Sequence, residues 1–352
     1  HIGDIMLIAA MLLLGILLSF FSVYGYTSFP FSYALNIILL LCMMSLIQQD
    51  RDFVVAQLYK YTFISILFVI ILVLKNGTSA LFETCLTIAS GVNENQLAMA
   101  LTQMVAVVIT YLINRKRRVF AYCLLFILIT GLFLTGSRSG IIAALLCISF
   151  VYFVYIVAMW KTASKNKRAK MIADVIMIDV IICLLYFYLG QKVPAVMDRF
   201  TYENVVATGG TNRLDIWKAL LTKALPGHYL FGIGFDPINA YYAVQSINGI
   251  GHGSHNLIIE ILTKTGIAGM ATYTLFFTRL FKSLMRNVQK HLELLLPFAV
   301  IIAILANGIG EDVLTARFLW FGVGLAYMLL NSIQSAAVQS PYKRNAHGDI
   351  NE

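Results

Sequence analysis

"LAMALTQMVAVVITYLI" (residues 97–113) is a run of 17 residues without a charged side chain. As a helix it would be about 25 Å long, close to the thickness of the hydrocarbon core of a bilayer. The rest of the chain has the same character, because 59% of its 352 residues are hydrophobic and 12% are charged. A soluble core does not need so much apolar side chain, so the sequence indicates an integral membrane protein.

Ten apolar runs of this kind follow one another along the chain. Each approaches the roughly 20 residues that cross a bilayer, and in lipid the backbone groups must be satisfied within the segment, which requires helices. We therefore predict an all-α polytopic membrane protein with about ten transmembrane helices. The runs are Ile5 to Tyr24, Phe31 to Ile47, Tyr61 to Leu74, Leu97 to Ile113, Val119 to Leu134, Ile141 to Met159, Ile172 to Leu189, Gly266 to Leu284, Leu292 to Ile309 and Leu314 to Leu330.

Basic residues predict the orientation of these helices. They gather after the fourth, sixth, eighth and tenth runs, and the positive-inside rule makes those ends cytoplasmic. The net charge of +9 suits anionic lipid of the inner leaflet. It does not indicate a nucleic-acid partner, because the clusters are short and carry no aromatic platform. The clusters are Arg115 to Arg118, Lys161 to Lys170, Arg279 to Lys290, and Lys343 with Arg344.

This orientation divides the chain into four parts. Residues 1–190 would hold transmembrane helices 1–7, and residues 191–254 a large extracytoplasmic loop with an amphipathic helix. Residues 255–334 would hold a helix with one polar face in contact with water, which we call the half-wet helix, followed by transmembrane helices 8–10. Residues 335–352 would form a cytoplasmic tail. The turn "TGSRSG" (residues 135–140) would also face outward.

The helix expected in the large loop is "TNRLDIWKALLTKAL" (residues 211–225). Asn212 is a suitable N-cap, and Pro226 with Gly227 ends the pattern. An apolar stripe of Leu214, Trp217, Leu221 and Ala224 recurs at helical spacing. We expect this helix to lie on the membrane surface or to pack against the bundle.

Two arginines on the outer side are candidate anion ligands. Arg138 lies in the turn "GSRSG", where small neighbours leave room for a large ligand, although a lone arginine at a helix end can also anchor lipid phosphate. Arg213 opens the loop helix, one turn before Trp217. Its guanidinium could stack on the indole, or it could bind an anion together with the free amides of the helix terminus.

The segment "GSHNLIIEILTKTGIAG" (residues 253–269) places a titratable imidazole at the point where the chain enters the membrane. A neutral His255 could accept a proton near neutral pH. The alternatives are a capping or interfacial histidine, or a metal site with His252 and a third ligand such as Asp236. Glu260 and Lys264 form an i, i+4 pair on the polar face of the expected half-wet helix. We expect no metal and no cofactor.

Five of the polar side chains inside the apolar runs stand out. Polar groups are costly in lipid, so we expect them to face the bundle interior, where they would serve mainly in helix packing. They are Gln103, Asp174, Asp179, Asn307 and Arg317.

These motifs together resemble the O-antigen ligase and Wzy polymerase superfamily of bacterial envelope glycosyltransferases. The resemblance rests on His255-Asn256, nine residues, Gly266, two residues and Gly269, downstream of "TGSRSG" and of "RLDIW" in a long outer loop. It covers residues 97–330 in order and topology. Members of this superfamily usually have two more spans, so we expect a missing N-terminal helix pair.

The resemblance implies a metal-independent, inverting GT-C type transferase in the bacterial inner membrane, with its active site on the extracytoplasmic face. Its donor would be a glycan on undecaprenyl diphosphate. Arg138 and Arg213 would bind the diphosphate and His255 would be the base. Asn256, Trp217, Glu260, Gly266 and Gly269 would support them.

The first functional hypothesis is a repeat-unit polymerase, whose acceptor is another lipid-linked glycan. The second is a ligase, which transfers the same donor to lipid A core, and local motifs do not separate the two. A transporter of an anion or a sugar is a distant alternative. The absence of an internal repeat and the position of the motifs at the outer face, away from the midplane, count against it.

Overall fold

The computed structural model describes residues 51–83, 94–114, 117–192, 209–235 and 253–345. Within residues 72–83, 209–212 and 334–345, and at residues 51 and 190, it describes the backbone alone. It also describes single residues elsewhere, namely 3, 6, 9, 10, 13, 17, 35, 36, 38–40, 42, 43, 198, 201 and 244. Most of the first two expected spans, together with His252 and Asp236, therefore lie outside the described residues.

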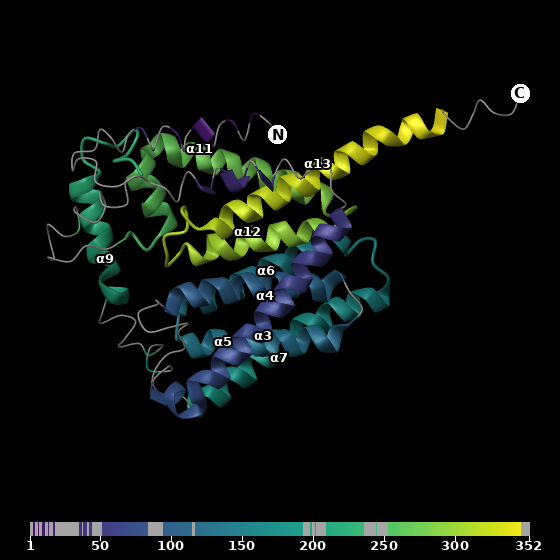
Figure 1. Cartoon of the computed structure of the whole chain (residues 1–352), viewed down its shortest axis with the longest axis horizontal. Helices are drawn as coiled ribbons and strands as arrows, with labels where there is room; N and C mark the ends of the chain where they lie inside the picture. The colour runs from purple at the N-terminus through teal and green to yellow at the C-terminus, as the bar shows by residue number, and fades with distance from the viewer. Residues whose placement is uncertain are drawn as a thin grey trace, which may run out of the picture.

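The described part of the chain is helical and contains no strand. Helices α4, α6 and α12 pack against one another, α5 packs on α4, and α13 packs on α12 (Figure 1). The helices are α3 (Arg51–Glu83), α4 (Glu94–Asn114), α5 (Arg118–Thr135), α6 (Arg138–Met159), α7 (Lys165–Lys192), α9 (Gly209–Ala219), the π-helix η3 (Leu220–Ala224), α11 (Leu257–Asn287), the 3-10 helix η4 (Leu292–Leu294), α12 (Leu295–Asn307) and α13 (Arg317–Asn345).

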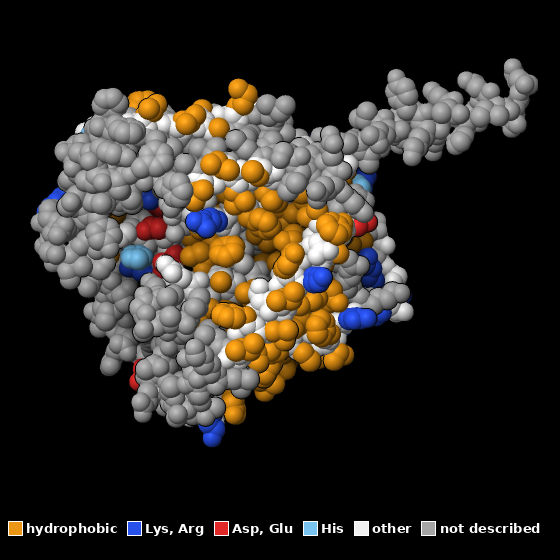
Figure 2. All heavy atoms as spheres, in the orientation of Figure 1, with side chains coloured by type: hydrophobic (Ala, Val, Ile, Leu, Met, Phe, Trp, Pro, Cys, Tyr) orange, Lys and Arg blue, Asp and Glu red, His pale blue; other side chains and the backbone are white. Residues whose placement is uncertain are grey.

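Five of the described helices are long and apolar enough to cross a bilayer, and they lie in α3 to α7. Two shorter apolar helices, Leu292–Asn307 and Arg317–Ile333, follow them. Large apolar side chains such as Phe68, Phe153 and Phe187 point out of the bundle, and apolar side chains cover the middle of the face in Figure 2. The chain is therefore an all-α, multi-pass membrane protein, while the number of ten spans stays a prediction.

The polar groups in the apolar helices separate into two sets. Gln103, Asp174 and Asn307 are buried, as expected. The expectation is wrong for Asp179 and Arg317, which are exposed. Asp179 follows Asp174 by five positions, which places it about 140° around the helix and so on the outer face of α7. Arg317 is the first residue of α13, where a long side chain can reach outward.

α11 consists of two helices joined at Gly266, whose backbone is not helical (φ 64°, ψ −165°). Residues 229–234 dock on this break. Their carbonyls accept from Ile267 and Ala268 at 2.9 and 3.0 Å, and their amides donate to Thr263 and Lys264 at 2.9 and 3.1 Å. The backbone groups freed by the break are therefore satisfied by the loop, as a buried helix end requires.

The amphipathic helix of the large loop begins earlier than predicted. α9 begins at Gly209, so Asn212 lies inside the helix and is not its N-cap. The π-helix ends at Ala224, just before the predicted stop, and Gly227 has a positive φ of 84°. The helix therefore ends where the Pro-Gly pair indicated.

The predicted stripe of this helix is confirmed at Ala224, which is buried, and at Trp217, which packs on the same cluster, but it is wrong at Leu214 and Leu221, which are exposed. Ile216 and Leu220 are buried in this small cluster, which reaches Ile259 of α11. Packing against the first half of α11 and its nearby turns determines which face of the loop helix is buried. The periodicity of apolar residues alone did not identify that face.

Candidate active site

The segment before α11 holds His255 in a left-handed backbone conformation, with φ 48°. Among the described residues it is the one non-glycine residue with a positive φ, a conformation that costs roughly 1–3 kcal/mol. Its neighbours fix it in place. Trp217 Nε1 donates to the carbonyl of Ser254 at 2.8 Å. Asn256 caps α11, because its Oδ1 accepts from the amides two and three residues on at 3.0 and 3.1 Å.

The turn between α12 and α13, residues 308–316, lies beside this segment. Asn256 donates its side-chain amide to the carbonyl of Ile309 at 3.3 Å. The Ser254 hydroxyl donates to Asp312. The residues on both sides of the histidine are therefore tied to the same turn.

Glu311 in this turn approaches two of the predicted site residues. Its Oε2 lies 3.5 Å from His255 Nδ1, and its Oε1 lies 3.7 Å from Arg213 Nη2. The Glu311 side chain is 11% exposed, and those of His255 and Arg213 are 28% and 25% exposed. Three distant parts of the chain thus bring a carboxylate, an imidazole and a guanidinium together at a partly covered position.

The charge of Glu311 changes the proton affinity of the imidazole. The neighbouring Glu311 carboxylate raises the pKa of His255 above its ordinary value, and Asp312 adds to this effect. Partial burial and the positive charge of Arg213 act in the opposite direction. The imidazole is therefore a stronger base than an isolated histidine.

Arg138 is the first residue of α6, and it is partly exposed. Ser137 caps this helix by accepting from the amide of Gly140 at 3.3 Å. The next residue, Ser139, lies against Gly310, where an added Cβ would be 2.6 Å from Ser139 Cβ and 2.8 Å from Arg213 Nη1. The turn that carries Arg138 therefore meets the Arg213 guanidinium at Gly310.

Glu260 connects the first part of α11 to the 308–316 turn. It is 1% exposed, its Oε1 accepts from Lys264 Nζ at 2.7 Å, and its Oε2 accepts from the amide of Leu314 at 3.0 Å. Burial raises the pKa of Glu260, and Lys264 opposes that shift. The predicted i, i+4 pair is confirmed. The prediction of a half-wet helix is wrong at Glu260, because this residue faces the 308–316 turn, which covers it.

The two glycines of the motif have structural positions. A Cβ at Gly266 would collide with the backbone of Leu230 in the docked loop, and Gly266 also has the positive φ that favours glycine. A Cβ at Gly269 would collide with the side chain of Thr265. These residues therefore allow the break in α11 and the close approach of the loop.

A family model described as O-antigen ligase matches residues 123–274. This segment of the chain is similar to the O-antigen ligase family. The resemblance to the O-antigen ligase and Wzy polymerase superfamily is confirmed by this match. No curated protein matches the chain.

The matched segment contains Arg138, Arg213 and the whole element from His255 to Gly269. The match supports a glycosyltransferase that acts on a lipid-linked glycan, and it does not support the transporter alternative. The matched segment ends before α12, so Glu311 reaches the site from outside it.

Glu311 and Asp312 are the residues that sequence reasoning did not assign to the site. No sequence pattern links this pair to His255 or Arg213, which lie more than 50 positions away. The available signal was its position, two acids directly after "NGIG" at the outer end of an apolar run. Figure 2 shows acidic, basic and histidine side chains close together at the end of the bundle near α9.

Proposed function

We propose that the protein is a polymerase of lipid-linked oligosaccharide repeat units at the extracytoplasmic face of the bacterial inner membrane. It transfers the growing glycan from undecaprenyl diphosphate to the terminal sugar of a second lipid-linked unit. The observation that carries this proposal is the approach of Arg213 and His255 to the same carboxylate of Glu311. Arg213, which can bind a diphosphate, and His255, which can act as a base, are then within reach of one substrate.

Arg138 and Arg213 bind the donor diphosphate in this mechanism. A guanidinium offers paired donors that match phosphate oxygens, and charge-assisted hydrogen bonds to phosphate are among the strongest in proteins. Their contact with the leaving group also stabilises the negative charge that grows there in the transition state. The meeting of the Arg138 turn and Arg213 at Gly310 supports a shared role.

His255 takes the proton of the attacking hydroxyl group. Its Nδ1 faces Glu311, so the carboxylate favours the tautomer that carries hydrogen on Nδ1 and leaves Nε2 as the acceptor. The acceptor oxygen forms a bond to C1 of the donor sugar as the bond from C1 to the diphosphate oxygen breaks. The electron pair leaves with undecaprenyl diphosphate, the proton stays on His255, and the configuration at C1 inverts.

Glu311 links the two parts of the site in this proposal. In the free protein its charge is shared between Arg213 and His255, at 3.7 and 3.5 Å. A bound diphosphate draws Arg213 toward its own oxygens, which leaves Glu311 to stabilise the imidazolium that forms during transfer. Donor binding therefore strengthens the base.

The same arginines make a metal unnecessary for neutralising the diphosphate, so we expect glycan transfer to continue at an unchanged rate in excess EDTA. A loss of activity that Mg²⁺ restores would contradict metal independence. The experiment is performed with purified protein and lipid-linked repeat units, and a heat-denatured sample gives the background.

A ligase is the second candidate, since the matching family model is described as O-antigen ligase. Purified protein incubated with lipid-linked repeat units alone separates the two. A ladder of longer lipid-linked glycans supports the polymerase. Product that forms only after lipid A core is added overturns it in favour of the ligase.

A further inference from the structure

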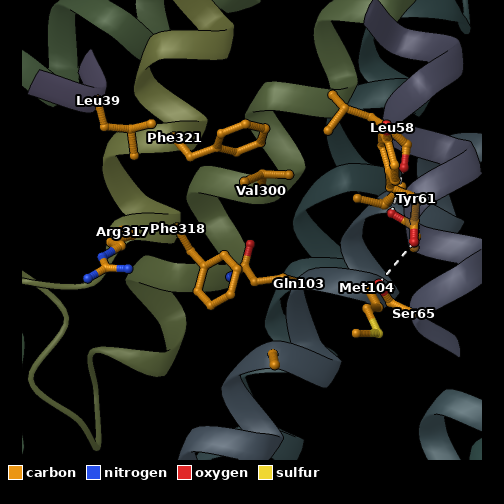
Figure 3. Close-up of a pocket in the computed structure, with 13 residues that line it drawn as sticks. Leu39, Leu58, Tyr61, Ser65, Gln103, Met104, Val300, Arg317, Phe318 and Phe321 are labelled. Carbon is orange, nitrogen blue, oxygen red and sulfur yellow. Dashed lines mark hydrogen bonds between the residues drawn. The ribbon is translucent and has the colours of Figure 1, made fainter. Parts of the chain in front are cut away.

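A groove between α3, α4, α12 and α13 lies apart from the residues assigned above. It has a volume of about 350 Å³, within the usual range for a small-ligand site. Figure 3 shows Arg317 and Phe318 on one side and Leu58, Tyr61 and Ser65 on the other, with Val300 and Gln103 between them. Tyr61 is 64% exposed and Phe318 is 44% exposed, so the groove opens on the outer face of the bundle.

Three of the polar side chains in the wall of the groove already have partners. Thr62 and Ser65 donate to carbonyls of their own helix at 2.8 and 2.9 Å. With the oxygen and nitrogen of its side-chain amide exchanged, Gln103 donates to the carbonyl of Val300 at 3.2 Å and accepts from the amide of Ile304 at 3.1 Å. The groove therefore offers mainly apolar surface, which suits a hydrocarbon chain.

Arg317 differs from these side chains because it is charged. Of the described residues that line the groove, it is the one that carries a charge. It is exposed at the first turn of α13 and has no ion pair with another described residue. A guanidinium at a helix N-terminus and next to lipid favours a phosphate group, which gives it charge-assisted hydrogen bonds that the surrounding hydrocarbon cannot.

We propose that this groove binds the lipid of the acceptor substrate, with the polyprenyl chain against α3, α4 and α13 and its phosphate at Arg317. This inference rests on the proposed polymerase function, which needs two lipid-linked substrates at one face of the membrane. Arg138 and Arg213 serve the first substrate. Arg317 follows Glu311 by six residues, so a lipid held at Arg317 is anchored on the same connection that carries Glu311 to His255.

The binding test uses the full chain in phosphatidylcholine nanodiscs and a photoreactive polyprenyl phosphate. We expect labelled peptides from α3, α4 or α13 in the wild type, and at least tenfold less label there in R317Q. R317K should keep most of the label, and R286Q, which removes an exposed arginine of α11, should keep all of it. Equal labelling of R317Q and the wild type overturns the proposal. Competition by phosphatidylglycerol as effective as by unlabelled polyprenyl phosphate also overturns it, since the groove would then hold ordinary membrane lipid.

A kinetic test assigns the groove to the acceptor. The donor is capped at its terminal sugar, so that it cannot accept. The acceptor carries a non-cleavable phosphonate, so that it cannot donate. We expect R317Q to raise the KM of this acceptor at least tenfold, with the donor KM and the use of a lipid-free acceptor glycan unchanged. An increase in the donor KM alone refutes the acceptor assignment. A wild-type protein that labels in the groove but forms no product refutes the polymerase instead.

Discussion

Replacing Glu311 by Gln tests the coupling at the centre of the proposed mechanism. The substitution keeps the shape of the side chain and removes the charge that lies 3.5 Å from His255 Nδ1 and 3.7 Å from Arg213 Nη2. The 3.5 Å separation is longer than an ordinary hydrogen bond, so we treat it as a charge contact. If the contact stabilises the imidazolium by about 1.4 kcal/mol, its removal corresponds to roughly a tenfold decrease in kcat.

The pH dependence of E311Q has a defined direction. Transfer requires neutral His255, so activity falls as pH decreases through the pKa of this group. Glu311 raises that pKa, so E311Q should lower it and move the acidic limb of the kcat profile to lower pH. The KM of the donor should stay the same or decrease, because Arg213 loses the carboxylate that competes with the diphosphate.

The assay is the rate of ladder formation by purified protein, measured from mildly acidic to mildly basic pH. E293Q is the matched control, because Glu293 lies 3.4 Å from His291 in a second histidine–glutamate pair. The control should retain the wild-type profile. An E311Q profile with an unchanged acidic limb and an unchanged kcat would refute the role of Glu311, and so would a limb moved to higher pH.

Three further predictions concern other parts of the site. H255A should lower the transfer rate about 10²–10⁴-fold with normal membrane insertion, and glycan chains of normal length in this variant would refute its role as the base. R138A and R213A should each abolish transfer at ordinary donor concentrations, with R213K partly active. An unchanged donor KM in both would contradict the diphosphate site. G266A should lower the free energy of unfolding by more than the roughly 1–3 kcal/mol of backbone strain, whereas G227A, with a positive φ but no atom within 4 Å of the added Cβ, should show the strain alone. Equal decreases in the thermal unfolding temperature of the two glycine variants in detergent would contradict this prediction. They would show that the docked loop moves to accommodate the added Cβ.

The sequence by itself determined the class of structure and supplied most of the residues of the candidate site. Apolar runs of bilayer length permit only helices when lipid is the solvent, so the class followed from composition and length. The element from His255 to Gly269, and the stop at Pro226 and Gly227, are local signals, since each depends on residues that are neighbours in one turn or one helix. The Glu260–Lys264 pair was predictable for the same reason.

The tertiary structure decided which distant residues meet. Glu311 reaches His255 and Arg213 only because the 308–316 turn packs beside the start of α11, and no local pattern encodes that contact. The outward position of Arg317 likewise depends on which side of α13 the other helices cover. Periodicity specifies a face within one helix, whereas the packing of several helices determines what that face touches.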